Sequence, residues 1–305
     1  MMHAKQLEHD CGYFFKYITP RMQKADFCIA NMEFPLGGEP YTGYPAFSTP
    51  DWYAEYIARC GTDVFLTANN HILDRGTKGL KRTIRVYDRM VDSLGIRYTG
   101  VGNEPLILNH RGLRIALVNF TYGTNIGAQV LKPDVMRMRR KDVGHAIDEA
   151  RKAGADFIVA LPHWGIEYRL RHDETQEDWA RWLAEQGCCA IVGSHPHVVQ
   201  DTSHVRGVPV VYSLGNAVSN MSVENTRLEL AVTLRFVRDY GTGTVRMLEP
   251  ELDFMWCTLP GRLTSSYATV FIKEWANRRS DWLTPSDYDN MMATLERVKA
   301  ATGIR

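Results

Sequence analysis

Hydrophobic positions recur along the chain with two periods, and each period predicts a kind of secondary structure. Over residues 76–94 apolar side chains return every three or four positions, which is the spacing of one helical face. Short apolar runs that end in polar residues predict buried strands instead. On these patterns we expect helices over 51–59, 76–94, 142–150, 175–186 and 285–301, and strands over 26–31, 64–66, 114–121, 156–161, 190–193 and 208–214. The alternation of strands and helices predicts an α/β fold.

The pattern changes after residue 216. Residues 227–237 alternate between apolar and polar, which predicts a half-exposed antiparallel strand, and the glycines of 241–243 are expected to turn it back toward 245–248. The chain contains no repeat, low-complexity tract or obvious linker. We therefore expect a main domain over residues 1–260 and a helical C-terminal appendage over residues 261–305 that packs on the same domain.

Five polar strings come directly after predicted strands. In α/β sheets, ligands bind at the carboxyl ends of the strands, so we expect these strings to lie close together. They offer carboxylate, amide and imidazole groups. The strings are Asn31-Met-Glu33, Asn69-Asn-His71-Ile-Leu-Asp74, His163-Trp-Gly-Ile-Glu167, Gly193-Ser-His-Pro-His197 and Ser213-Leu-Gly-Asn216.

Oxygen and imidazole donors without thiolates suit Mn, Fe, Zn, Mg or Ca. A lone histidine at a strand end is more often an ordinary polar residue than a ligand. His195 and His197 are a stronger signal, because alternate residues of an extended chain point the same way and Pro196 forbids a helix there. Five such strings together favour a site for one or two divalent ions, and two ions can activate a water and stabilise an in-line displacement.

Composition excludes several other classes of protein. The chain has 36 Lys and Arg against 35 Asp and Glu, so its net charge of +1 argues against a broad basic face for nucleic acid. No run of 18 apolar residues predicts a membrane span. The six cysteines include no CxxC pair, which indicates thiols in a reducing compartment and favours a cytoplasmic location. An upstream segment, if one precedes this sequence, would instead favour an extracytoplasmic, membrane-associated protein.

The strings resemble, in order, those of the bacterial capsule-synthesis CapA family, also called the poly-gamma-glutamate synthesis proteins. The resemblance covers about residues 25–220, and its most specific parts are Asn-Asn-His-x-x-Asp-x-Gly over 69–76 and His-Pro-His-Val over 195–198. This family belongs to the calcineurin-like metallophosphoesterase superfamily. The resemblance therefore implies a four-layer α/β/β/α sandwich with a two-metal site at the strand ends.

The resemblance also implies a role for individual residues. His71 would act as general acid or hold the leaving oxygen, and Asp74 would orient it. Glu167 and Asn216 would face the substrate. The implied metal ligands are Glu33, Asn70, His163, His195 and His197.

One part of the family pattern has no match in this sequence. The family opens with a strand and a Gly-Asp string whose aspartate binds metal, and no Gly-Asp occurs before Asp26. We therefore expect the first strand of the sandwich to be truncated in this chain. Without that aspartate, the site would hold a single weakly bound ion or none.

The function implied by the resemblance is that of a metal-dependent hydrolase of the metallophosphatase type. A metal-bound hydroxide would attack a phosphorus or carbonyl centre while His71 assists the leaving group. The implied role is in making, exporting or trimming capsule or poly-gamma-glutamate, with an anionic polymer or a small phosphoester as substrate. A phosphoester and an amide or ester bond both remain open.

The alternative is a non-catalytic subunit of a polymer-synthesis or export complex. Such a subunit would keep the fold with an incomplete metal site and would contact the polymer-synthase subunits. The missing Gly-Asp favours this alternative, whereas the retained His71, Asp74 and His-Pro-His string favour the hydrolase.

Overall fold

The largest sheet has six strands in the order β4-β5-β6-β7-β9-β8. The computed structural model describes residues 9–126 and 134–305 of the chain. The inner strands β5, β6, β7 and β9 run parallel, and β4 and β8 pair antiparallel at the two edges. The strands are β4 (Leu106–His110), β5 (Leu113–Thr121), β6 (Phe157–His163), β7 (Ala190–Val192), β8 (Thr202–Val205) and β9 (Val208–Val211).

Two three-stranded sheets lie against one face of the six-stranded sheet. The parallel one has the order β1-β2-β3, and the antiparallel one has the order β10-β13-β14. Their strands are β1 (Ile29–Asn31), β2 (Val64–Leu66), β3 (Arg97–Thr99), β10 (Leu228–Thr233), β13 (Glu251–Thr258) and β14 (Ala268–Phe271). Val64 of β2 packs in one core cluster with Leu117 and Val159, while Leu228 of β10 packs with Val211. Burial of these apolar faces holds the sheets together.

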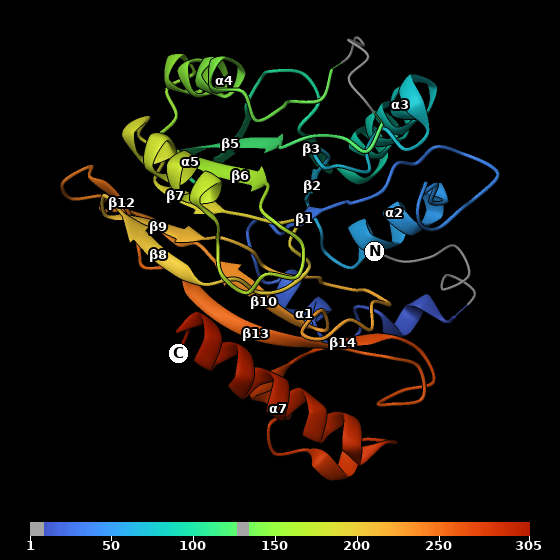
Figure 1. Cartoon of the computed structure of the whole chain (residues 1–305). Helices are drawn as coiled ribbons and strands as arrows, with labels where there is room; N and C mark the ends of the chain where they lie inside the picture. The colour runs from blue at the N-terminus through green and yellow to red at the C-terminus, as the bar shows by residue number, and fades with distance from the viewer. Residues whose placement is uncertain (1–8, 127–133) are drawn as a thin grey trace.

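Helices cover the outer faces of the sheets, as Figure 1 shows. On the six-stranded sheet lie α4 (Arg140–Lys152) and α5 (Glu174–Glu185), and their apolar stripes share a core cluster with β5, β6 and β7. On the sheet of β1 to β3 lie α2 (Asp51–Arg59) and α3 (Gly76–Leu94), and on that of β10, β13 and β14 lies α7 (Pro285–Thr302). The α/β fold and the four layers α/β/β/α are thus confirmed.

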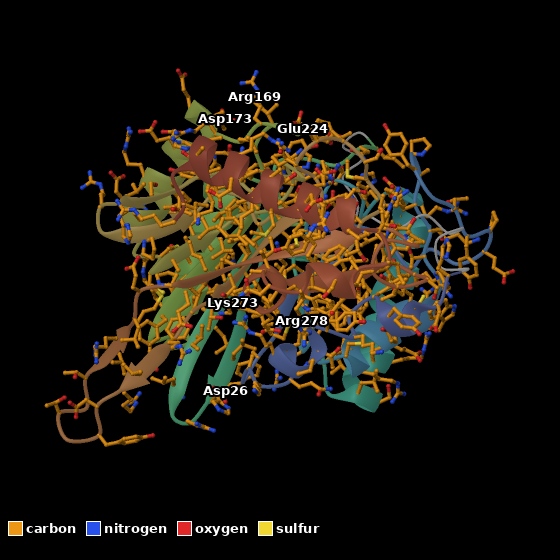
Figure 2. The ribbon with its side chains drawn as sticks, turned by 90° about the horizontal axis from the view of Figure 1, so that it is seen from below. Asp26, Arg169, Asp173, Glu224, Lys273 and Arg278 are labelled. Carbon is orange, nitrogen blue, oxygen red and sulfur yellow. The ribbon has the colours of Figure 1, made fainter. Side chains whose placement is uncertain are left out.

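The shorter elements lie at the periphery. They are η2 (Cys11–Tyr13), α1 (Thr19–Met22), α6 (Ile272–Trp275), η3 (Arg279–Asp281) and the hairpin of β11 (Phe236–Arg238) and β12 (Val245–Met247). In the view from below, this hairpin projects from the body, and the labelled Asp26 lies beside the β4–β5 turn, where its Oδ1 is 3.0 Å from His110 Nε2 (Figure 2). Within the described residues, no helix combines the length and the apolar character that a membrane crossing needs.

The strand expected over 227–237 is wrong in one respect, because it is two strands. β10 pairs with β13 over the whole of Leu228–Thr233, and only β11 turns back onto β12 as expected. The strand β13 itself had no counterpart among the expected elements. The segment 261–305 contributes β14 as well as helices, and its division from residues 1–260 stays a prediction. The expected truncation of the first strand concerns the start of the chain, and residues 1–8 lie outside the described part.

Glu229 is a fully buried carboxyl group in the middle of β10, with 1% of its surface exposed. Neither carboxyl oxygen has a hydrogen-bond partner in the part of the chain that the structure describes. Burial raises the pKa of Glu229 well above its usual value, because the charged form loses its hydration. Because of this raised pKa, the contribution of Glu229 to stability is greatest below pH 4.5, the usual pKa of a glutamate. The contribution falls as the pH rises toward the pKa of Glu229 in the folded state.

We therefore expect Glu229→Gln to stabilise the protein at pH 8 by about 1–3 kcal/mol, or roughly 2–4 °C in Tm for each kcal/mol. The gain should shrink toward pH 5, where the wild-type carboxyl group keeps its proton. Thermal unfolding of both proteins between pH 5 and pH 8 checks this. A gain that is equal at both pH values would contradict the assigned charge effect.

Candidate metal centre

The five strings meet where the carboxyl ends of the parallel strands come together. Strand β1 pairs with β2 so that Asn31 lies opposite Leu66, and Glu33 and the 69–74 loop therefore emerge at the same end. Strand β6 ends at His163, and an isolated parallel bridge joins His163 to Ser194. This bridge brings the 193–197 string beside β6. Ligand groups from two different sheets consequently face one another.

The predicted metal ligands form one cluster around Glu33. Glu33 Oε1 lies 3.8 Å from His163 Nε2 and 3.7 Å from His197 Nε2. Asn70 Oδ1 lies 2.9 Å from His163 Nε2. Donor atoms of Glu33, His163 and His195 all lie within 4.8 Å of one another, which is a spacing that one ion can bridge. The structure thus brings together all five residues for which the family resemblance implied this role.

Three donor atoms of this cluster are buried and have no hydrogen-bond partner among residues 9–126 and 134–305. They are Glu33 Oε1, His195 Nδ1 and His197 Nε2. Buried polar atoms are nearly always paired, because an unpaired one costs about 1–3 kcal/mol. Carboxylate oxygen and imidazole nitrogen are donors that divalent ions accept. The residues present therefore fit a divalent cation.

The protonation states suit this interpretation. Burial lowers the pKa of His195 to about 4 and that of His197 to about 3, and it lowers the pKa of His163 well below the usual range. All three imidazoles are therefore neutral at pH 7, and each keeps a lone pair. Burial raises the pKa of Glu33 to about 7. An adjacent cation favours the charged carboxylate and opposes this rise.

Asn216 lies behind His197. Asn216 Nδ2 donates to the carbonyl oxygens of His197 at 3.1 Å and Thr226 at 3.0 Å, which leaves its Oδ1 to accept from His197 Nδ1 at 3.0 Å. The Nδ1 proton is thereby fixed, and Nε2 keeps the lone pair that faces Glu33. This geometry makes Asn216 an orienting residue for His197. Its expected contact with the substrate stays a prediction.

His71 and Asp74 form a dyad at the edge of the cluster. His71 Nδ1 lies 2.6 Å from Asp74 Oδ2, which also accepts from the backbone amide of Phe47 at 2.9 Å. The Phe47 ring packs edge-on against the imidazole at 4.6 Å, and His71 is only 3% exposed. Asn125 Nδ2 lies 3.1 Å from His71 Nδ1. Asp74 is therefore placed to hold the imidazole in one orientation.

Sequence reasoning missed three residues that touch the cluster. The Tyr122 ring lies 4.6 Å from that of His195, Asn125 touches His71, and Ser194 Oγ lies 3.0 Å from His163 Nδ1. Tyr122 and Asn125 follow β5, so their position after a strand was the available signal. Neither belongs to a polar string of the kind found after the other strands.

Two curated relatives are 28% and 29% identical to this chain over the aligned residues. The capsule biosynthesis protein CapA of Bacillus anthracis is 29% identical over 264 residues, which cover 79% of this chain and 62% of the relative. The PGA biosynthesis protein CapA of Bacillus subtilis strain 168 is 28% identical over 238 residues, which cover 75% of this chain and 62% of the relative. The chain thus spans less than two thirds of the length of either relative.

A solved structure, the calcineurin-like phosphoesterase YfkN from Bacillus subtilis, is similar over 83% of this chain and 76% of that one. Its TM-score of 0.45 at 15% sequence identity is too low to support a functional argument. The family described as "Bacterial capsule synthesis protein PGA_cap" matches residues 1–221, which include every predicted ligand of the cluster and the His71–Asp74 dyad. The chain therefore belongs to this bacterial capsule-synthesis family.

Proposed function

We propose that this protein is a metal-dependent hydrolase of the metallophosphatase type that acts in making, exporting or trimming capsule or poly-gamma-glutamate. The observation that carries the proposal is the convergence of Glu33, His163, His195 and His197, three of them with an unpaired donor atom, beside the His71–Asp74 dyad. Membership of the capsule-synthesis family and the names of the two relatives support the biosynthetic role.

The cluster would hold one or two divalent ions. Bound ions would supply an activated water and would neutralise charge that develops at the reacting centre. The donor set suits Mn, Fe, Zn, Mg or Ca. The ligands would be Glu33, Asn70, His163, His195 and His197.

The remaining chemistry falls to His71. Asp74 accepts a hydrogen bond from His71 Nδ1–H, so Nε2 is the nitrogen that can deliver a proton to the leaving oxygen. Because Phe47 packs on the ring and the imidazole is buried, bulk water has little access to it. A leaving oxygen of a phosphoester and one of a carboxylic ester can both accept this proton, and an amide nitrogen can do so after attack.

The alternative is a non-catalytic subunit that contacts polymer-synthase subunits. The names of both relatives refer to biosynthesis and not to hydrolysis. They therefore support a non-catalytic subunit as well as they support a hydrolase. The two functions differ in whether the purified protein turns over a substrate with metal bound.

Elemental analysis of protein purified without added metal or chelator is the decisive first experiment. We expect one or two divalent ions per chain in the wild type and a loss of at least one in Glu33→Gln. Hydrolysis of bis(p-nitrophenyl) phosphate and of poly-gamma-glutamate should stop after chelation and return with Mn²⁺. His204→Ala, which changes a half-exposed histidine paired with Glu249, is the matched control. A wild type that binds metal but hydrolyses neither substrate would favour the subunit.

A further inference from the structure

Glu167 stands at a second group of donor atoms that overlaps the first. Donor atoms of Glu167, His195 and His197 all lie within 4.8 Å of one another. His195 is common to both groups, and Glu33 Oε1 lies 3.7 Å from His197 Nε2. The cluster therefore extends beyond the inner group of Glu33, His163 and His195, toward a carboxylate on the molecular surface.

The backbone holds Glu167 against the 195–197 string. The amide of Trp164 donates to the carbonyl oxygen of Ser194 at 3.0 Å, and the amide of Tyr168 donates to that of Pro196 at 2.8 Å. These two bonds lie on either side of Glu167. Arg169, from the same loop, is exposed and lies at the outer surface in Figure 2.

Three residues at this contact have left-handed backbone conformations. The φ angles are +66° at Tyr168, +107° at His195 and +60° at His197. Such conformations cost a non-glycine residue of the order of 1–3 kcal/mol and are retained where the surrounding structure demands them. Both sides of the contact between Glu167 and the histidines therefore carry strain, which is common where side chains are aimed at a ligand.

His197 supplies an independent sign of a missing partner. Its side chain is 98% buried, and Asn216 engages Nδ1, yet Nε2 has no hydrogen-bond partner. A neutral imidazole in this state presents a lone pair to the space beside Glu33. Glu33 Oε1 of the inner group lies 3.7 Å from His197 Nε2, which is too long for a hydrogen bond.

We propose that Glu167 is a ligand of a second, outer divalent cation, which it binds together with His195 and His197. This assignment rests on the proposed function, and it replaces the expected substrate contact of Glu167 by a metal contact. His195, which is common to both groups, is assigned here to the outer cation. The inner cation would then be held by Glu33, His163 and Asn70, whose Oδ1 lies 2.9 Å from His163 Nε2.

The two cation sites differ in burial and charge. Glu33 is largely buried, whereas Glu167 is exposed to solvent. Water screens the attraction between a cation and an exposed carboxylate more than between a cation and a buried one. The outer cation should therefore bind more weakly and exchange first. Since the other outer donors are neutral imidazoles, Glu167 would provide most of the charge that sets the affinity of this site.

Mn²⁺ binding to chelator-treated protein tests the assignment without any assay of activity. By calorimetry, we expect the wild type to bind two Mn²⁺ ions with unequal affinities. Glu167→Gln should keep the tighter ion and weaken the other by at least tenfold, and Glu167→Asp should restore part of the loss. Electron paramagnetic resonance should show spin coupling between two Mn²⁺ ions in the wild type and an isolated Mn²⁺ ion in Glu167→Gln. Glu104→Gln, at a surface carboxylate, is the matched control.

The outcomes separate this inference from the proposed function. A wild type that binds one ion, or a Glu167→Gln variant with both affinities unchanged, would overturn the role of Glu167 and leave the inner site intact. An unchanged affinity together with a raised KM would return Glu167 to a substrate contact. A wild type that binds no Mn²⁺ would refute the metal-dependent hydrolase itself. Circular dichroism checks that the Glu167 and Glu104 variants fold.

Discussion

Replacing His71 with alanine is expected to lower kcat/KM for bis(p-nitrophenyl) phosphate by about 10²- to 10⁴-fold, the range typical of a lost general acid. The reason is that His71 Nε2, which lies 3.4 Å from Asn125 Nδ2, is the nitrogen available to deliver a proton when Nδ1–H donates to Asp74. Metal content should not change, because the donors of Glu33, His163 and His195 do not include His71. Steady-state kinetics with parallel elemental analysis measures both quantities.

Two further variants separate a chemical role of His71 from a structural one. Asp74→Asn keeps the shape of the dyad but weakens the hold on the imidazole, so we expect a smaller fall in kcat and a displaced pH profile. His204→Ala should keep wild-type kinetics, since His204 lies on the edge strand β8. Wild-type rates in His71→Ala, with metal bound, would sink the role given to His71.

The largest expected effect on stability concerns the attachment of α7. Arg227, directly before β10, forms two hydrogen bonds with Asp287 of α7, at 2.8 Å and 2.7 Å, and both side chains are about nine-tenths buried. The guanidinium also lies 4.3 Å from the centre of the Trp256 ring. Asp287→Ala leaves this cation buried without its partner. We expect a loss of about 3–5 kcal/mol in the free energy of unfolding, measured by urea denaturation.

The same helix offers a control for this prediction. Asp289 pairs with Arg279 at 2.7 Å, but both of these side chains are more than half exposed. We expect Asp289→Ala to leave the free energy of unfolding almost unchanged, because water screens an exposed pair. The double variant Arg227→Met with Asp287→Leu should recover most of the lost stability, since it removes both charges together. Equal losses in the two single variants would show that burial of the pair is not the cause.

Local patterns were sufficient to predict elements whose signal is contained in their own sequence. The helix over residues 76–94 was predicted to its last residue, and Gly95 ends it with a φ of +68°. The apolar period of this helix places Val91 on the buried face together with Tyr87. In the structure Val91 is 38% exposed, whereas Met90 is buried. The sheet it packs against, and not its own period, decides which flank of the stripe is covered.

Long-range pairing could not be predicted from such patterns. Strand β13 carries Asp253 between apolar residues and pairs with β10, whose paired residues lie 18 to 28 positions earlier in the chain. The alternation that predicted one strand over 227–237 continues through the bend between β10 and β11. Only the partner strands show that the two halves belong to different sheets.

In the candidate site, too, local motifs could be predicted from the sequence whereas contacts between distant residues could not. The strings identified Glu33, His163 and the His195–His197 pair because their residue types and order were distinctive. The direction of each side chain was beyond the sequence, which gave no sign that Asn216 lies against His197. Tyr122 packs on His195 through a ring contact that no local motif marks.

The origin of the donors in two different sheets has a kinetic consequence. Glu33 and Asn70 follow β1 and β2 of one sheet, whereas His163, His195 and His197 follow β6 and β7 of the other. A cation can therefore meet its full set of ligands only after the two sheets have docked. If the sheets dock after the folding transition state, ligation would leave the folding rate unchanged and would slow unfolding. The ion would accordingly act as a kinetic lock that prolongs the lifetime of the native state without hastening its formation.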